Sequence, residues 1–206
     1  MLKRSSFAYF KSKLVKQFLT LMVHPPQNLY QVPGYLSPCE GRFLFWLASK
    51  MPPNGLAVEI GSFKGKSTSF LASGMTSGGK LACIDSWGND AMPYDPKESS
   101  FQDFQTNTRA YRNAIECHQG ISADISISWK RPIDLLFIDG DHSYGGCSSD
   151  IKSWVHFVRK GGWIAFHDSG ESGVSKALSE HLPNWVVRYP TYADSIFAFK
   201  KLGDRS

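Results

Sequence analysis

The 206-residue sequence lacks the features that mark several classes of protein. It has no run of about 18 apolar residues, so we expect no membrane-spanning helix. None of its four cysteines stands in a CxxC pair, and their spacing fits no common zinc motif. Basic residues interleaved with aromatic ones are also missing, and we therefore expect no nucleic-acid partner.

The sequence also has no sign of export. Cys83 and Cys117 lie in apolar runs, where a thiol behaves as a small hydrophobic group. Scattered basic residues occupy the N-terminus, and no small-residue cleavage site follows them, which argues against a signal peptide. Reduced cysteines and a missing leader predict a cytoplasmic protein.

Composition and charge predict one globular domain. Hydrophobic residues make up 42% of the chain and charged residues 20%, which is typical of a folded protein with a full core. The net charge is +5, and five basic residues lie near the N-terminus, whereas the rest of the chain is close to balance. These five are Lys3, Arg4, Lys11, Lys13 and Lys16.

Apolar residues at helical spacing predict an amphipathic helix over residues 1–22. They are Phe7, Phe10, Leu14, Phe18 and Leu21. Such a helix could lie on an anionic membrane or line a homodimer, but we favour packing on its own domain. We therefore divide the chain into an N-terminal helix and linker, 1–32, and a main domain, 33–206.

The main domain is predicted to alternate strands and helices. Ser37 and Glu40 form a capping-box pattern that starts the first helix. The strands and helices predicted after this first helix alternate along the chain. Such alternation implies an α/β fold, with an open and largely parallel sheet covered by helices on both faces. Strands are expected at 56–60, 81–84, 114–118, 133–138, 163–166, 186–189 and 195–199, and helices at 66–75, 101–112, 149–158 and 173–182.

Polar residues gather where the predicted strands end. Ligands of open α/β sheets bind outside the carboxyl ends of the strands, so this pattern predicts a binding site. The residues at these ends are Glu59, Gly61, Asp85, Ser122, Asp139, Asp141, His167 and Asp168.

The glycine loop after the first strand admits two interpretations. Gly65-Lys66-Ser67 is similar to the end of a phosphate-binding loop, and Asp139 follows an apolar run as a magnesium-holding Asp would. A nucleotide triphosphatase that uses Lys66 and Asp139 is therefore the alternative function. That motif needs four residues between its glycines, however, and only three separate Gly61 from Gly65.

The second interpretation is a nucleoside that carries no triphosphate. Asp85 lies 24 residues after Gly61, near the offset of about 20 at which an acidic residue binds ribose hydroxyls. Glu59 would suit a cationic amino group. A ribose and a cation together describe S-adenosylmethionine (SAM) better than NAD, whose G-x-G-x-x-G turn is missing.

Three segments, VEIGSFKGKSTSFLA, IDSW and LLFIDGDHSYGGCSSDIKSWVHFVRKGGWIAFHD, resemble class I SAM-dependent methyltransferases. The similarity is greatest to the subgroup with IDGDHSY and GG…FHD segments, methyltransferase family 24. This resemblance implies a Rossmann-like, doubly wound sheet of seven strands, six parallel and the last antiparallel. It also implies roles for single residues: Glu59, Gly61, Ser62 and Gly65 at the methionine end, Asp85 at the ribose, Trp87 near the sugar or adenine, Ser122 at the adenine and Asp139 by the methyl group.

The resemblance and the strand-end residues together suggest O-methylation of a small molecule or sugar. Related metal-dependent O-methyltransferases place acids at the same two strand ends, which makes Asp139, Asp141 and Asp168 candidate ligands of Mg²⁺ or Mn²⁺. A metal lowers the pKa of the acceptor hydroxyl. Without one, His142 or His167 would act as the base. The predicted catalytic residues are Asp141, His142 and His167.

Overall fold

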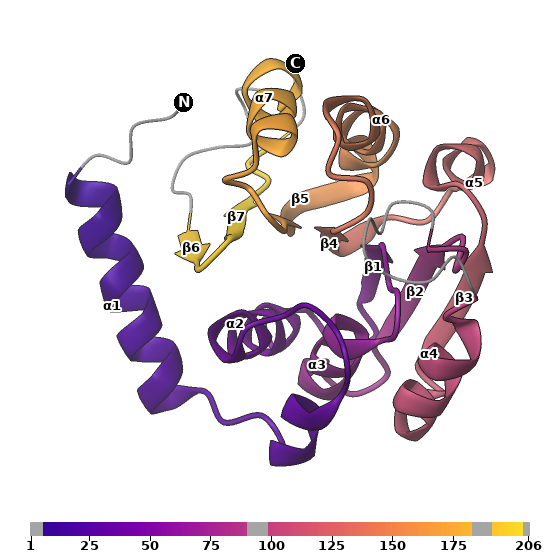
Figure 1. Cartoon of the computed structure of the whole chain (residues 1–206), viewed down its shortest axis with the longest axis horizontal. Coiled ribbons are helices and arrows are strands. Elements are labelled where there is room, and N and C mark those ends of the chain that lie inside the picture. The colour runs from indigo at the N-terminus through magenta and orange to yellow at the C-terminus, as the bar shows by residue number, and fades with distance from the viewer. Residues whose placement is uncertain (1–5, 90–98, 183–190, 204–206) are drawn as a thin grey trace.

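The computed structural model describes residues 6–89, 99–182 and 191–203, with side chains from residue 13 on. Its centre is a seven-stranded sheet in the order β3-β2-β1-β4-β5-β7-β6 (Figure 1). β1 to β5 pair in parallel, while β7 runs antiparallel to both of its neighbours. This confirms the predicted fold class. The strands are β1 Leu56–Ile60, β2 Lys80–Asp85, β3 Ile115–Gln119, β4 Ile133–Ile138, β5 Val158–Phe166, β6 Thr191–Ala193 and β7 Ile196–Lys200.

Helices cover both faces of the sheet. Figure 1 shows α2, α3 and α4 on one face and α5, α6 and α7 on the other. Each face has its own apolar cluster, because alternate side chains of a strand point to opposite sides. The helices are α1 Ser6–Met22, α2 Pro38–Ala48, α3 Lys66–Gly74, α4 Phe101–Thr108, α5 Ser122–Ser128, α6 Tyr144–Trp154 and α7 Ser172–His181, with 3₁₀ turns at Gln27–Gln31, Arg109–Tyr111 and Val155–Phe157.

Some predicted boundaries were wrong. The helix expected at 149–158 begins five residues earlier, at Tyr144, because Ser143 caps it by accepting a hydrogen bond from the Gly146 N–H. β5 begins at Val158, well before the predicted 163, and the helix α5 was not predicted. The strand expected at 186–189 lies outside the described residues.

The start of α2 agrees with the capping-box prediction. The Ser37 hydroxyl accepts a hydrogen bond from the Glu40 N–H, and the Glu40 carboxylate accepts one from the Ser37 N–H. Pro38 occupies the first turn, where its missing N–H costs nothing. The cap fixes the position of Glu40, which is buried.

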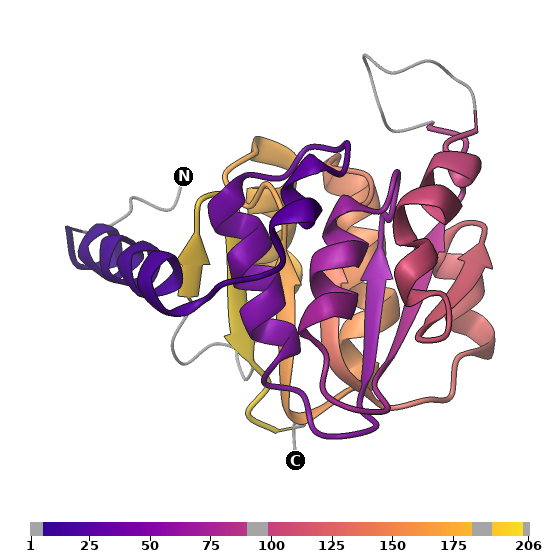
Figure 2. The same cartoon turned by 90° about the horizontal axis from the view of Figure 1, so that it is seen from below.

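The N-terminal helix α1 packs on the domain, but not through the predicted stripe. Val15, Leu19 and Val23, spaced four residues apart, face the apolar cluster around α2. Leu14 and Leu21 of the predicted stripe are instead 50% and 63% exposed. Figure 2 shows α1 at the rim of the molecule, beside β6. No described helix is both long and apolar enough to cross a membrane. The division into 1–32 and 33–206 stays a prediction.

Candidate functional site

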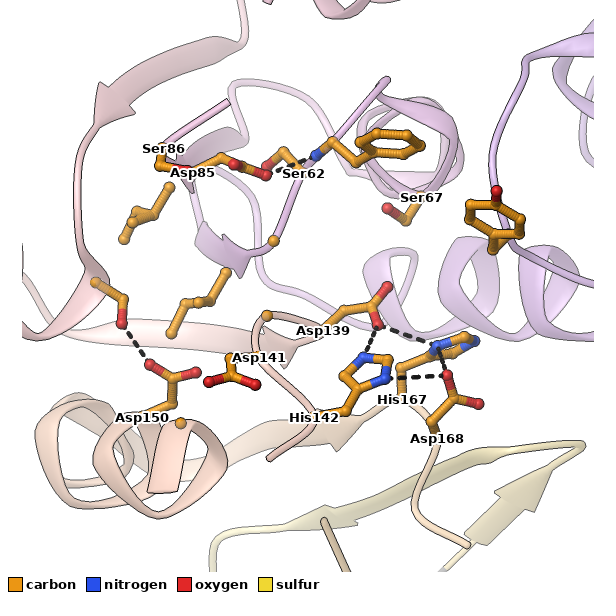
Figure 3. Close-up of a pocket in the computed structure, with 18 of the residues that line it drawn as sticks. Ser62, Ser67, Asp85, Ser86, Asp139, Asp141, His142, Asp150, His167 and Asp168 are labelled. Atoms are coloured by element: carbon orange, nitrogen blue, oxygen red, sulfur yellow. Dashed lines mark hydrogen bonds and ion pairs between the residues drawn. The ribbon is translucent and has the colours of Figure 1, made fainter. Parts of the chain in front are cut away.

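A cavity of about 1060 Å³ lies at the carboxyl ends of the parallel strands (Figure 3). It brings together most of the residues that the sequence placed at strand ends. Three predicted residues, Glu59, Gly65 and Trp87, do not line it. Those that do are Gly61, Ser62, Asp85, Ser122, Asp139, Asp141, His142, His167 and Asp168.

Gly61 joins the first loop to the end of β4. Its φ is +86°, and a Cβ at this position would lie 2.1 Å from the Asp139 carbonyl oxygen. The Gly61 N–H donates to the Ile84 carbonyl at 2.9 Å, which continues the pairing between β1 and β2. Only glycine allows this conformation at such a close approach. The loop is therefore held against the strands on both sides.

Glu59 lies behind this loop, fully buried. Its Oε2 accepts hydrogen bonds from the hydroxyls of Ser62, at 2.8 Å, and Thr68. Its Oε1 makes no hydrogen bond with the described residues. Burial raises the pKa of Glu59 to about 7 despite these hydroxyl donors. Glu59 thus holds the loop from behind, which corrects its expected place at the surface of the binding site.

Asp85 ends β2 with its carboxylate in the cavity. Its two oxygens accept hydrogen bonds from the backbone N–H groups of Phe63 and Trp87, each at 2.7 Å. Burial raises the pKa of Asp85, and these backbone donors oppose the shift. Each carboxylate oxygen has a second lone pair, so Asp85 retains the capacity to accept hydroxyl donors from a ligand.

Trp87 was expected near a sugar or adenine, and the structure turns it away from the cavity. Its φ of +52° directs the side chain into the core, where it is fully buried between Phe101 and Phe104. Its Nε1–H donates to the Phe63 carbonyl at 3.1 Å. Trp87 therefore supports the glycine loop from the core.

Ser122 contacts an acidic residue, Asp150, that was not predicted as part of the site. The Ser122 hydroxyl donates to Asp150, a buried residue of α6 that lines the same cavity. Burial raises the pKa of Asp150 to about 6, although this hydrogen bond opposes the shift. Asp150 lies inside a helix and follows no strand, so its position in the sequence gave no sign of the site.

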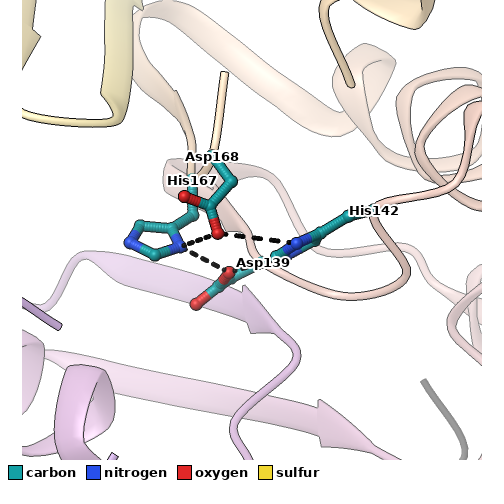
Figure 4. A group of neighbouring side chains, drawn as sticks. All are labelled: Asp139, His142, His167 and Asp168. Atoms are coloured by element: carbon teal, nitrogen blue, oxygen red, sulfur yellow. Dashed lines mark hydrogen bonds and ion pairs between the residues drawn. The ribbon is translucent and has the colours of Figure 1, made fainter. Parts of the chain in front are cut away.

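A second group of titratable side chains converges at the ends of β4 and β5 (Figure 4). Asp139, His142, His167 and Asp168 each offer one potential metal-ligand atom, a carboxylate oxygen or an imidazole nitrogen. These four atoms all lie within 4.8 Å of one another. Nδ1 of His167 is 3.0 Å from Asp139 Oδ1 and 3.1 Å from Asp168 Oδ2. Nε2 of His142 is 3.2 Å from the same Asp139 oxygen, and its Nδ1 is 3.5 Å from Asp168 Oδ2. We call these four residues the Asp–His cluster.

Glu40 stands behind the Asp–His cluster and was not predicted as part of the site. Its Oε2 lies 3.5 Å from Nε2 of His167, and its Oε1 accepts from the N–H and hydroxyl of Ser195 at 2.9 and 2.7 Å. Burial disfavours its charge, but His167 and the donors of Ser195 and Ser37 lower the pKa of Glu40 to about 2. Glu40 is thus a fixed negative charge next to His167.

The carboxylates control the charge of both imidazoles. Burial opposes protonation of His167, yet Asp139, Asp168 and Glu40 raise the pKa of this residue to about 12. The hydrogen bond with Asp139 raises the pKa of His142, against the effect of burial. The hydrogen bond from His167 lowers the pKa of Asp168. With only protein groups present, the neighbouring carboxylates therefore favour the protonated form of His167.

Asp141 was expected to ligate a metal, but it lies outside the Asp–His cluster. Its carboxylate accepts hydrogen bonds from the N–H and the hydroxyl of Ser143, both at 2.8 Å. These bonds order the turn that leads into α6. Asp141 faces the cavity between Asp150 and Asp139 (Figure 3), so the Asp–His cluster contains two histidines in place of the third aspartate that was expected.

The Asp–His cluster has the composition and spacing of a metal site. Two ligands bound at about 2.1 Å to one ion are separated by roughly 3.0–3.4 Å in octahedral or tetrahedral geometry. Three of the imidazole-to-carboxylate distances, 3.0, 3.1 and 3.2 Å, lie in this range. Glu40 adds a carboxylate next to the second ring nitrogen of His167, as is usual for histidines that bind metals.

The nucleotide triphosphatase interpretation depends on Lys66 and Asp139. The Nζ of Lys66 donates to the Gly34 carbonyl at 3.2 Å, and the chain ahead of α2 covers this part of the loop. Asp139, the other residue that a triphosphatase would need, is engaged by two imidazoles. Both side chains therefore already have protein partners in the places where a triphosphatase would use them to bind the triphosphate and its magnesium.

Comparison with known proteins gives one family match. The family model described as "Methyltransferase domain" matches residues 58–169, which include the end of β1, the glycine loop, Asp85 and the whole Asp–His cluster. Among curated proteins, the uncharacterized protein R132 of Acanthamoeba polyphaga mimivirus is 50% identical over 36 residues, which is 18% of this chain and only 16% of that protein.

Solved structures share the fold over nearly the whole chain. The O-methyltransferase from Bacillus cereus in complex with SAH has a TM-score of 0.65 at 17% identity and covers 94% of this chain and 99% of its own. TomG from Streptomyces achromogenes, an O-methyltransferase in complex with SAM, has a TM-score of 0.68 at 18% identity, covering 98% and 100%. SAH-bound PaMTH1 from Podospora anserina gives 0.67 at 14% identity, covering 96% and 97%.

Proposed function

Because this chain belongs to the family of methyltransferase domains, we propose that it transfers the methyl group of SAM to an oxygen atom of a small molecule or sugar. The observation that carries the proposal is one cavity with Asp85 in one part and the Asp–His cluster in another. The SAM- and SAH-bound O-methyltransferases of the same fold support both the cofactor and the acceptor atom. The family match does not support a nucleotide triphosphatase.

The part of the cavity beside β1 and β2 fits the cofactor. Asp85 would accept hydrogen bonds from the ribose hydroxyls, because its oxygens are held in place by two backbone N–H groups. Gly61 and Ser62 would border the methionine end, and Ser122 with Asp150 would meet the adenine. Bound SAM supplies the methyl sulfonium, and the protein orients it.

The Asp–His cluster would act on the acceptor. We propose that Asp139, His142, His167 and Asp168 hold a divalent ion, with Glu40 accepting the second ring N–H of His167. Of the two ions expected, Mn²⁺ suits this mixed set better than Mg²⁺, which prefers oxygen ligands alone. Such an ion lowers the pKa of a bound hydroxyl. Without it, His142, whose side chain is 32% exposed, is the group that would take the acceptor's proton.

Calorimetry with SAM and with S-adenosylhomocysteine (SAH), its demethylated product, tests whether the chain binds this cofactor. We expect binding of both, and thermal stabilisation by SAM but not by ATP with magnesium. Folded protein that binds neither compound would contradict the proposal. Methyl transfer to panels of phenols, catechols and sugars, followed as SAH release, then identifies the acceptor class.

Metal removal tests the second part of the proposal separately. We expect Mn²⁺ to bind the wild-type chain, to bind Asp141→Asn equally well and to bind Asp168→Asn at least about tenfold more weakly. Exhaustive chelation should abolish methyl transfer, and Mn²⁺ should restore it. Activity that survives chelation would leave the methyltransferase function intact and assign the proton to His142.

A further inference from the structure

The outer face of α1 is an apolar surface that the described part of the chain leaves largely exposed. We define this face by Leu14, Phe18, Leu21 and Met22, which are 45–67% exposed. The spacing of these residues places them on one side of the helix, next to the side that packs on the domain. Only Phe18 contacts a neighbouring ring, that of Trp46 at 6.3 Å. A contiguous apolar stripe at the rim of a protein marks an interaction surface.

The charge of the N-terminal segment distinguishes it from the rest of the chain. The first acidic residue of the sequence is Glu40, so the whole segment up to α2 carries only basic charge. Lys3, Arg4, Lys11, Lys13 and Lys16 equal the net charge of +5, because the remaining 18 basic residues balance 18 acidic ones. The excess charge of the protein is thus concentrated on and just before α1.

The described lysines lie outside the apolar face. Lys13 is exposed and lies to the side of the outer face nearest Leu21, at about 100° of rotation per residue. Lys16 forms an ion pair with Asp194, in the turn before β7, which ties α1 to the domain. The buried residues Leu19 and Val23 add an apolar contact on the side of the helix that packs on the domain. The outer face is therefore presented by a helix that is anchored to a folded body (Figures 1 and 2).

We propose that the outer face of α1 docks the protein on an anionic lipid surface. An apolar stripe with lysines and no acidic residue matches both layers of such a surface: the acyl boundary and the negative headgroups. A second copy docked through the same face would instead bring two basic segments together with no acidic residue to neutralise them. The inference is independent of the reaction and of the metal.

The test uses the full-length chain and vesicles, with flotation as the measurement. We expect binding to phosphatidylcholine vesicles that contain about one-third phosphatidylserine to be at least about tenfold tighter than to pure phosphatidylcholine. Added salt should weaken this binding, because it screens the headgroup charge. Equal affinity for the two kinds of vesicle, or no binding to either, would overturn the proposal.

Paired variants locate the contact. Leu14→Ser combined with Leu21→Ser should weaken vesicle binding at least about tenfold, whereas Ile127→Ser, which changes a more exposed apolar residue on α5, should leave it unchanged. Lys13→Glu should weaken it at least about fivefold, and Lys152→Glu on α6 should have a much smaller effect. If the double variant does not fold, the vesicle binding of Lys13→Glu, compared with that of Lys152→Glu, still tests the proposal.

Sedimentation equilibrium identifies the competing occupant. A dimer that dissociates in the Leu14→Ser, Leu21→Ser variant, together with no preference for anionic vesicles, would assign the face to a second copy and overturn the lipid proposal. A monomer that binds anionic vesicles through the same residues supports it.

Discussion

The acidic residues in and behind the two halves of the cavity are held in opposite ways. Beside β1 and β2, Glu59 and Asp85 receive hydrogen bonds from hydroxyls and backbone N–H groups, and burial raises the pKa of both. Beside β4 and β5, Glu40 and Asp168 face imidazoles, and their pKa values are lowered. One half therefore holds its acidic residues among uncharged hydrogen-bond donors, and the other brings acidic residues together with imidazoles.

The largest effect is expected in the charged half. His167→Gln removes one member of the Asp–His cluster and leaves Asp139, Asp168 and Glu40 facing a neutral side chain. We expect methyl transfer to fall by roughly 10²–10⁴-fold, the usual contribution of a positioned acid–base group or ligand. Affinity for SAH, measured by calorimetry, should change less than about twofold. A parallel loss of SAH affinity would mean that the two halves do not act separately.

A pH-dependent effect is expected at Glu59. Its folded pKa of about 7 exceeds the ordinary value of 4.5, so the folded state retains a proton that the unfolded state loses between these values. The contribution of Glu59 to the free energy of unfolding should therefore be fully present below pH 4.5 and fall by about 3 kcal/mol as the pH rises from 4.5 to 7.

Urea unfolding across this range, with Glu59→Gln as the comparison, measures the effect. The neutral glutamine should remove this component of the pH dependence. Identical profiles for the two proteins would show that Glu59 is ionised when folded, and the contrast between the halves would then fail.

A smaller effect is expected at Asp85. Asp85→Ala removes the acceptor for two backbone N–H groups and for the ribose, which should weaken SAH binding by about 1–3 kcal/mol. The exposed Asp124→Ala is a matched control and should bind SAH as the wild type does. Unchanged affinity in Asp85→Ala would remove this residue from the cofactor site.

The smallest effect is expected at Asp141, which belongs to neither group. Asp141→Ala should cost about 0.5–2 kcal/mol in the free energy of unfolding, because the Ser143 N–H and hydroxyl before α6 lose their acceptor. Thermal unfolding gives this value, and Mn²⁺ affinity should stay within about twofold. A large loss of metal affinity would restore Asp141 as a ligand.

The sequence predicted the sheet and most of the cavity, because strand ends and their polar residues form a local pattern. Asp85, Asp139, His167 and Asp168 line the cavity, as expected from their positions after apolar strands. Glu40 was recognised only as a helix cap, since its contact with Ser195 joins residues 155 positions apart. A local sequence pattern cannot predict a contact between residues so far apart in the chain.

Two other errors have local physical causes. Trp87 follows Asp85 directly, but a left-handed backbone turns its side chain into the core, which residue type alone does not reveal. On α1, two apolar stripes lie side by side, and the one with the larger aromatic residues was taken as the packing face. The domain buries the other, Val15, Leu19 and Val23, and leaves Leu14 and Leu21 exposed.

The hydrogen bonds from Ser195 to Glu40 make the order of synthesis important. The carboxylate is translated early, whereas its two donors, the N–H and the hydroxyl of Ser195, emerge from the ribosome more than 150 residues later. A nascent chain that already contains β1 to β5 still lacks the support behind His167. The hydrogen bonds that hold Glu40 next to His167 can thus form only after the β6–β7 hairpin has been made.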